Sequence, residues 1–239
     1  MKKIKTKLVE LHDLNLEESL DWVIDNSENN KFKYVVTPNI DHLERLVKNR
    51  EGFSYLYEQA DLCLCDSRIL KVLLSIKSTP IDSVVPGSDL TAMLFDSPKL
   101  SNKKVLIFGG DDAIFKQLQD THERLDLTHI NPSMGFINKP EEVKELVASI
   151  KSLKPDVLFL AVGSPQQEKF AIALKQELEH GVALCIGASI LFITGEEKRA
   201  PIIFQKLHLE WFFRMIVAPR LIKRYWQNFL SLRLIYKSL

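Results

Sequence analysis

The stretch Gly163–Glu168, Gly-Ser-Pro-Gln-Gln-Glu, contains residue types that suit the binding of a phosphate group. It follows an apolar run at residues 157–162, which has the length of a strand buried on both faces of a sheet. Ser164 is expected to cap a helix that starts at Pro165, with Gln167 completing a capping box. The first turn of such a helix has unpaired N–H groups and a partial positive charge, which both favour a phosphate. From these residues alone, an ordinary strand-to-helix connection is the alternative.

Asp66 is the candidate catalytic residue, because it directly follows a short apolar strand expected at residues 60–65. A carboxylate in this position can be partly desolvated, which raises its pKa and makes it a better general base. The competing interpretation is a helix N-cap, since Asp is favoured there and a helix is expected from Ser67 to Ile76. On local sequence alone, the N-cap is the favoured interpretation.

The usual sequence signals for a bound metal or nucleotide cofactor are missing. The chain has neither a Gly-x-Gly-x-x-Gly segment nor a glycine-rich loop ending in Lys-Ser or Lys-Thr, and it has no Asp-x-Asp. Metal-ligand spacing is also missing among His42, His122, His129, His180 and His208. We therefore expect no metal site and no cofactor. The three cysteines are Cys63, Cys65 and Cys185. We interpret them as buried thiols, with metal ligation or a disulfide as the alternative.

Strands and helices are expected to alternate along most of the chain. The expected strands are 31–36, 60–65, 104–108, 127–130, 157–162 and 182–186, and the expected helices are 40–50, 67–76, 90–95, 112–124, 141–151 and 165–179. This alternation is typical of an α/β fold with a mostly parallel sheet and helices on both faces. Ligands bind at the carboxyl ends of the strands in such folds. Several candidate residues follow expected strands and should share one crevice: Thr37, Asn39, Asp66, Gly109, Gly110 and Gly163–Gln167.

Charge divides the chain into an acidic body and a basic tail. Residues 196–239 hold nine Lys or Arg and three acidic residues, a net charge of +6, whereas residues 1–195 carry a net charge of −5. Of the 239 residues, 46% are hydrophobic, which is enough for a sizeable core. We expect an α/β catalytic domain at 1–195 and a basic, aromatic-rich helical appendage at 196–239.

The tail pattern indicates amphipathic basic helices with aromatic anchors, which favours a membrane surface. The anchors include Trp211, Phe212, Phe213 and Trp226. An interface between copies of the chain or a helical layer that closes the sheet is the alternative; nucleic acid is disfavoured because the body is acidic and no recognised binding motif is present. The start of the chain lacks a signal-peptide core, and no apolar run approaches the ~20 residues of a membrane span, so a cytoplasmic location is expected.

Several short motifs occur in a specific order along residues 37–225. They are Thr37-Pro38-Asn39, Asp66, Pro86-Gly87-Ser88-Asp89-Leu90, Asn131-Pro132-x-x-Gly135-Phe136, Gly163-Ser164-Pro165-Gln166-Gln167-Glu168, Thr194-Gly195, Lys198-Arg199-Ala200-Pro201, Leu209-Glu210-Trp211 and Arg214. Together they resemble the WecG/TagA/CpsF glycosyltransferases, glycosyltransferase family 26. The resemblance covers nearly the whole chain.

The resemblance implies an inverting, metal-independent enzyme that moves a hexose or N-acetylhexosamine-type sugar from a UDP-sugar to a lipid-diphosphate-linked saccharide. Such enzymes act at the inner face of the cell membrane in the synthesis of teichoic acid, common antigen, or capsule and exopolysaccharide. The implied fold is a Rossmann-like α/β domain with a C-terminal helical appendage that contributes to the active site. The composition of the tail adds an anionic membrane surface as an expected partner, with self-association through the appendage as the alternative.

The resemblance also assigns roles to particular residues. Asp66 matches the proposed base, Thr37 and Asn39 match substrate-pocket residues, and Gln167 matches a polar residue at the nucleotide sugar. Basic residues for the diphosphate fall at Arg214, Arg220 and Arg224. With the strand-end and loop residues, the complete expected donor and substrate site is Thr37, Asn39, Gly109, Gly135, Gly163, Ser164, Gln166 and Gln167.

Some positions depart from the family pattern, which leaves the donor sugar and the acceptor open. Ser67 stands where Gly commonly follows the aspartate, and Val84, Met134 and Leu191 stand where Arg, an aromatic residue and Asp are common. The alternative within this fold is a catalytically silent sugar-nucleotide-binding protein. A dinucleotide-dependent oxidoreductase is a further class, which the missing glycine fingerprint disfavours.

Overall fold

A parallel sheet forms the centre of the protein. The computed structural model describes residues 1–48, 52–197, 201, 204, 210–218 and 222–239. The sheet has six strands in the order β4-β3-β8-β7-β5-β6, and each neighbouring pair is parallel. Its strands are β3 (Lys33–Val36), β4 (Leu62–Cys63), β5 (Lys104–Phe108), β6 (Asp126–Ile130), β7 (Val157–Leu160) and β8 (Val182–Cys185). The expected α/β fold is confirmed.

Strands β7 and β8 are apolar throughout because the sheet is covered on both faces. Every residue of β7 and β8 is buried, and alternate side chains point to opposite faces. Leu158 and Leu160 belong to one apolar cluster, whereas Val157 and Phe159 belong to the other. This two-sided burial explains why continuous apolar runs predicted these strands.

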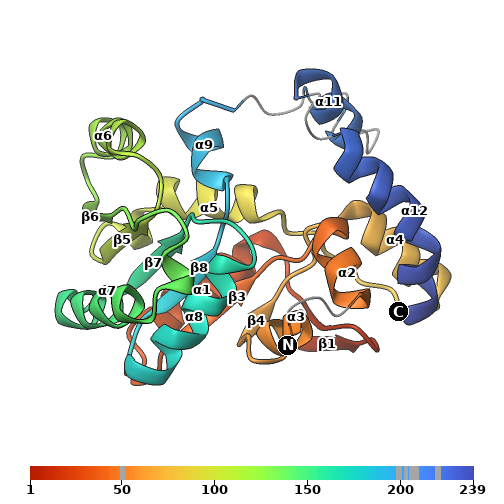
Figure 1. The fold of residues 1–239 in the computed structure, drawn as a ribbon, viewed down its shortest axis with the longest axis horizontal. Helices are drawn as coiled ribbons and strands as arrows, with labels where there is room; N and C mark the ends of the chain where they lie inside the picture. Colours follow the sequence, from red (N-terminus) through yellow and green to blue (C-terminus); the bar gives the residue numbers. More distant parts are fainter. Residues whose placement is uncertain (49–51, 198–200, 202–203, 205–209, 219–221) are drawn as a thin grey trace.

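Two sets of helices cover the two faces of the sheet. The first cluster contains residues of α2 (Ile40–Val47), α3 (Phe53–Glu58), α4 (Arg68–Ile76), α7 (Pro140–Leu153), α8 (Gln166–Glu177) and α12 (Ile222–Ser238). The second contains residues of α1 (Leu16–Ser27), α5 (Gly87–Asp96), α6 (Asp112–Thr121) and α9 (Ser189–Ile193). Figure 1 shows α6 and α7 at one end of the molecule and α11 (Glu210–Val217) and α12 at the other.

The amino-terminal segment adds elements that the sequence analysis did not predict. Strands β1 (Lys2–Lys5) and β2 (Glu10–Asp13) form an antiparallel hairpin. An isolated parallel bridge between His12 and Leu64 places β2 beside β4, and His12 Nδ1 accepts a hydrogen bond from Cys63 N at 3.0 Å. The outer side of β4 is therefore covered rather than left as an open edge.

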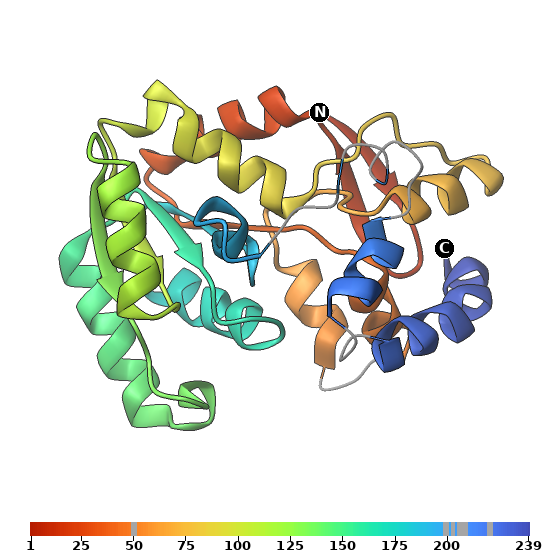
Figure 2. The same ribbon diagram turned by 90° about the horizontal axis from the view of Figure 1, so that it is seen from above.

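Helix α12 packs against α2 on the side of the molecule that holds β3 and β4, as Figure 2 shows from above. Ile235 of α12 is completely buried and belongs to the same cluster as Leu43 and Leu46 of α2. At the far end of α12, Lys77 Nζ lies 4.7 Å from the centroid of the Tyr236 ring. The basic tail therefore lies directly on the helix that begins after Asn39.

The structure also bears on the membrane and cysteine predictions. None of the helices in the described part of the chain combines the length and apolar character that a membrane span requires.

Cys63, Cys65 and Cys185 are buried free thiols, as predicted. Burial raises the pKa of Cys65 to about 12, so this thiol stays protonated and unreactive at neutral pH.

Candidate active site

Two of the predicted site residues meet where β3 and β4 end. These strands are parallel neighbours, with Val36 opposite Cys63, so the segments that follow them leave the sheet side by side. Asn39 Nδ2 donates to Asp66 Oδ2 at 3.5 Å, and Asp66 N donates to the Pro38 carbonyl oxygen at 3.4 Å. Asp66 and Asn39 are both half-buried. A carboxylate and an amide therefore lie together at the carboxyl edge of the sheet, where ligands bind in this fold class.

Asp66 does not cap α4, so the N-cap interpretation of this residue is wrong. The cap is Ser67, whose Oγ accepts a hydrogen bond from Leu70 N at 3.2 Å. Ser and Asp are comparable N-cap residues, and the chain offers both in adjacent positions, so local preference alone could not separate them. With capping assigned to Ser67, the Asp66 carboxylate is positioned between the end of β4 and the start of α2.

Asn39 is held in one orientation by the start of α2. Its Oδ1 accepts hydrogen bonds from the N–H groups of Asp41 and His42, at 3.0 and 3.3 Å, so its amide nitrogen is turned toward Asp66. His42 Nδ1 in turn accepts from Asn39 N at 3.1 Å. Burial lowers the pKa of His42 to about 4, which keeps this imidazole neutral and able to accept at physiological pH. This role of His42 was not predicted from the sequence, where its only local signal is its position three residues after Asn39.

Helix α5 brings the Pro-Gly-Ser-Asp motif to the same place. A Cβ atom on Gly87 would lie 2.7 Å from Thr37 Oγ1, so only glycine allows this approach without a shift. Val85 N donates to the Cys65 carbonyl oxygen at 2.8 Å, which fixes the segment before α5 beside the end of β4. Thr37, Asp66 and the start of α5 are therefore neighbours, although they are far apart in the sequence.

The loop after β7 is connected to α2 by Arg45. One guanidinium nitrogen of Arg45 donates to the Ser164 carbonyl oxygen at 3.1 Å, and another pairs with Asp41 at 2.8 Å. Helix α8 begins at Gln166 after Pro165, with no side-chain cap. The predicted capping box between Ser164 and Gln167 is therefore wrong. No local pattern predicts the Arg45 bridge, because its partner is 119 residues away.

Gln167 joins the ends of β7 and β8 inside the protein. Its Oε1 accepts from Gly187 N at 2.9 Å, and its Nε2 donates to Glu168 Oε1 at 3.0 Å. Both amide atoms are thus engaged by the protein, and the side chain is buried. The adjacent Glu168 is only 1% exposed, and its burial raises the pKa of the carboxyl group. Neither the burial of Glu168 nor its pairing with Gln167 was predicted from the sequence.

We expect Glu168→Gln to become more stable than the wild type as the pH rises above the ordinary glutamate value of 4.5. Because burial raises the folded-state pKa of Glu168, the folded protein binds this proton more tightly than the unfolded chain does. The wild type therefore loses stability as the pH rises from 4.5 through the folded-state pKa, whereas glutamine does not titrate. Melting temperatures across this interval test the expectation. Glu177→Gln, at an exposed position of α8, is the control, and a difference that is independent of pH would contradict the explanation.

The remaining predicted donor residues lie further along the same edge of the sheet. Gly109 follows β5 with a φ of +95°, and a Cβ atom there would lie 2.7 Å from Val162 Cγ1. Gln166 is half-buried in the first turn of α8, and Gly135 follows β6. The ring of Phe136, the residue after Gly135, lies 5.3 Å (centroid to centroid) from the ring of Phe170 in α8, so the loop after β6 turns back toward α8.

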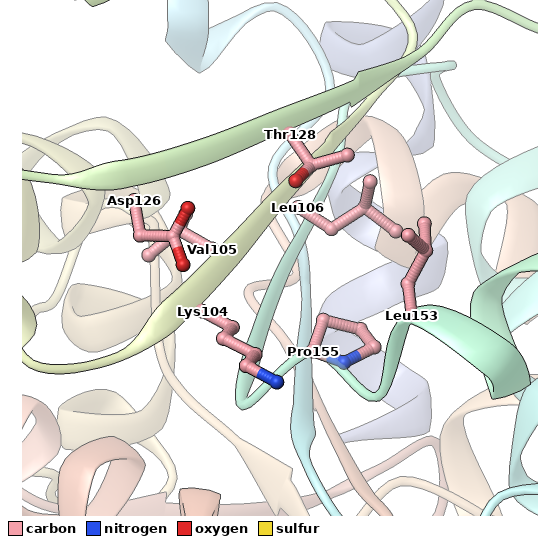
Figure 3. A pocket seen from close by; sticks show the side chains of 7 residues that line it. All are labelled: Lys104, Val105, Leu106, Asp126, Thr128, Leu153 and Pro155. Carbon is pink, nitrogen blue, oxygen red and sulfur yellow. The ribbon is translucent and has the colours of Figure 1, made fainter.

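A separate small pocket lies at the opposite edge of the sheet (Figure 3). It has a volume of about 210 Å³ and is lined by Lys104, Val105, Leu106, Asp126, Thr128, Leu153 and Pro155. Lys104 and Asp126 are the first residues of β5 and β6, so the pocket opens at the amino ends of these strands. None of the sequence motifs contributes a residue to it. Across the described ranges, no three His, Cys, Asp or Glu residues are grouped as metal ligands.

Comparison with known proteins identifies the family. The profile of the glycosyl transferase WecG/TagA/CpsF family matches residues 5–239. The chain belongs to this family. Glycosyl transfer is therefore its class of activity. N-acetylglucosaminyldiphosphoundecaprenol N-acetyl-beta-D-mannosaminyltransferase of Staphylococcus aureus strain NCTC 8325 / PS 47 is 26% identical over 216 residues, 88% of this chain and 82% of the relative. The enzyme of the same name from strain MRSA252 is 25% identical over the same shares of the two chains.

Three of the four departures from the WecG/TagA/CpsF pattern lie in different surroundings. Val84 packs against the first apolar cluster, and Leu191 packs against the second. Met134 is almost fully exposed at the tip of the loop after β6. This loop is fixed by Ser133, whose N and Oγ donate to the carboxylate of Glu142 at 3.0 and 2.7 Å. Two of the departures therefore complete the core, whereas Met134 projects into solvent.

The three predicted arginines of the appendage differ in what the structure describes. Arg224 is exposed in the first turn of α12, and its positive charge contributes to the lowered pKa of His42 in α2. Arg214 belongs to α11, where only its backbone is described, and Arg220 lies outside the described residues. Of these three arginines, Arg224 is thus the one whose charge acts on a described residue of α2, the helix that Asn39 caps.

Proposed function

We propose that the protein transfers a hexose or N-acetylhexosamine-type sugar from a UDP-sugar to a lipid-diphosphate-linked saccharide during synthesis of a bacterial surface polysaccharide. The observation that carries the proposal is the Asp66–Asn39 pair at the carboxyl edge of the sheet, in a member of this glycosyltransferase family. The names of the Staphylococcus aureus relatives support a lipid-diphosphate acceptor, because they specify N-acetylglucosaminyldiphosphoundecaprenol.

The proposed reaction is a single displacement with inversion. Asp66 takes the proton of an acceptor hydroxyl group, and the acceptor oxygen forms a bond to the anomeric carbon from the face opposite UDP. The bond between that carbon and the diphosphate oxygen breaks, and UDP leaves with the bonding electrons. Asn39 acts as a positioning residue, since its amide nitrogen contacts the Asp66 carboxylate and its amide oxygen is held by α2.

The departing diphosphate gains negative charge and needs stabilisation. The start of α8 after Gly163 supplies N–H groups and a partial positive charge. We assign the appendage arginines Arg214, Arg220 and Arg224 to the same task, because a guanidinium group pairs with phosphate oxygens in a bidentate manner. Thr37, Gly109, Gly135, Ser164, Gln166 and Gln167 complete the proposed donor and substrate site.

The outward face of α12 supports a peripheral location on an anionic membrane surface. Its exposed apolar residues are Ile222, Trp226, Phe229, Leu230 and Leu234. Basic residues share the helix, and residues 211–239 contain no acidic residue. We place the protein at the cytoplasmic face of the membrane, where its appendage (residues 196–239) meets the lipid and its α/β domain (residues 1–195) holds the donor. Self-association through the same face of α12 is the alternative use of this surface.

Product formation by the purified full-length protein tests the proposed function. A panel of UDP-sugars is offered with a lipid-diphosphate-linked N-acetylglucosamine, and the extended lipid product is detected by mass spectrometry. We expect product with at least one donor. UDP-sugar binding without any product would favour a silent sugar-nucleotide-binding protein, and tight binding of NAD(P)H would favour an oxidoreductase.

We expect sugar transfer to continue in the presence of EDTA. The chain has no Asp-x-Asp motif, and no group of candidate metal ligands exists among the described residues. The diphosphate charge would then be neutralised by helix dipoles and guanidinium groups instead of a divalent cation. Rates with and without EDTA check the prediction. Loss of activity that Mg²⁺ or Mn²⁺ restores would contradict it.

A further inference from the structure

We propose that the outward face of α4 is a second contact surface for an anionic lipid bilayer, next to α12 and beside Asp66. This inference rests on the proposed function. It concerns a helix of the α/β domain outside the basic tail, and it determines where the bilayer lies relative to the catalytic carboxylate.

The exposed face of α4 carries two large apolar side chains. Leu70 and Leu74 are completely buried against the body, whereas Val72 is 53% exposed and Ile76 is 61% exposed. Residues four apart lie on the same face of a helix, so Val72 and Ile76 form an outward apolar pair. Covering such a pair with another apolar phase removes its surface from water and is favourable.

Basic residues predominate around this pair, and the nearest acidic residue beyond the end of α4 is Asp82. The segment from Ser67 to Ile81 contains Arg68, Lys71 and Lys77 and no acidic residue. Helix α1 has the opposite character, with four acidic residues and no Lys or Arg, and it packs on the other face of the sheet. An anionic surface would therefore attract the α4 side of the molecule and repel the α1 side.

Helices α4 and α12 form a continuous region. Lys77, which caps the end of α4, lies 4.7 Å from the centroid of the Tyr236 ring in α12. Figures 1 and 2 both show the two helices at the same end of the molecule. Helices α4 and α12 thus meet, and both carry exposed apolar side chains beside basic residues. Apolar groups among cations are the composition that binds the interface of anionic lipid bilayers.

A second copy of the chain fits this face less well than a bilayer does. In a two-fold symmetric dimer the same patch occurs on both copies, so the basic residues of one α4 would approach those of the other. A bilayer contact also has a consequence for the reaction, because α4 begins two residues after Asp66. The lipid of the acceptor stays in the bilayer while its saccharide reaches Asp66 along the start of α4.

Vesicle binding by full-length variants tests the inference. The double variant Val72→Ser/Ile76→Ser is compared with the wild type by sedimentation with phosphatidylglycerol-containing vesicles. We expect its partition coefficient to fall roughly tenfold, the effect of removing two half-exposed apolar side chains from a lipid contact. Leu153→Ser on α7, where the leucine is 39% exposed, is the matched control and should bind as the wild type does. Thermal unfolding verifies that each variant is folded.

Transfer assays with two forms of the acceptor distinguish failure of this inference from failure of the proposed function. Transfer to an acceptor embedded in vesicles should fall with binding, whereas transfer to a detergent-solubilised acceptor should not change. Vesicle binding equal to that of the wild type would overturn the inference. A lipid-free change in oligomeric state would instead assign α4 to an interface between copies. If the wild type transfers no sugar to either acceptor, the proposed function fails while the vesicle comparison still decides the role of α4.

Discussion

Replacing Asp66 with Asn is expected to lower the turnover of sugar transfer about 10²–10⁴-fold, the usual contribution of a general base. Asparagine has nearly the same shape as aspartate, so the hydrogen bond from Asp66 N to Pro38 and the cap at Ser67 should be retained. UDP binding and thermal stability should therefore change little. Steady-state kinetics with a UDP-sugar and a solubilised lipid acceptor, together with calorimetric titration of UDP, provide the measurement.

Two further variants make this result specific to the carboxylate. Asp82→Asn removes a charge at an exposed position that pairs with Lys2, and it should leave turnover unchanged. Asn39→Ala should lower turnover in the wild type but have little additional effect in Asp66→Asn, because the two side chains act as a unit. Near-normal turnover of Asp66→Asn would mean that this residue only positions the start of α2.

The sequence predicted the strands of the sheet well where burial on both faces leaves a continuous apolar run. The run at Val157–Leu160 is of this kind, as is Lys104–Phe108. The hairpin of β1 and β2 was missed because Lys2–Lys5 contains three lysines and only Ile4 enters the core. Helix α1 was missed although it is capped by Asn15. Short polar elements that are stabilised by one core contact leave little periodic signal.

The candidate site was predictable only where a residue directly follows a strand. Asp66 and Asn39 were found in this way, since parallel strands end at one edge of the sheet. Arg45 and Glu168 were not, because their contacts depend on the packing of α2 against the loop after β7. The capping box was wrong because of another contact between distant residues: Gln167 pairs with Gly187, a residue 20 positions away, instead of the start of its own helix.

Removal of residues 196–239 is expected to lower sugar transfer by at least about 10²-fold, the typical loss when one group that stabilises transition-state charge is removed. It should also weaken binding to anionic vesicles, because the tail carries a net charge of +6 and the body carries −5. The structure adds a second effect. Without α12, the apolar side of α2 that Ile235 covers is exposed, so the helix that orients Asn39 loses part of its support.

Point variants separate these contributions. Ile235→Ser should detach α12 from α2 and lower transfer even to a solubilised acceptor, because a completely buried side chain of this size contributes about 2–5 kcal/mol to packing. Gln227→Ser, at an exposed position of the same helix, is the control and should retain full transfer. Arg224→Ala should lower turnover more than it lowers UDP-sugar binding, because the diphosphate acquires charge in the transition state.

The combination of outcomes decides what the tail does. Loss of transfer in Ile235→Ser with unchanged donor binding means that α12 acts through α2 on the Asp66–Asn39 pair. If sugar transfer is lost only in Arg224→Ala, the tail stabilises the leaving diphosphate. If transfer is lost only with acceptors in vesicles, the tail binds lipid. Should the protein lacking residues 196–239 transfer sugar and bind anionic vesicles as well as the full chain, the contact of α12 with α2 serves packing alone.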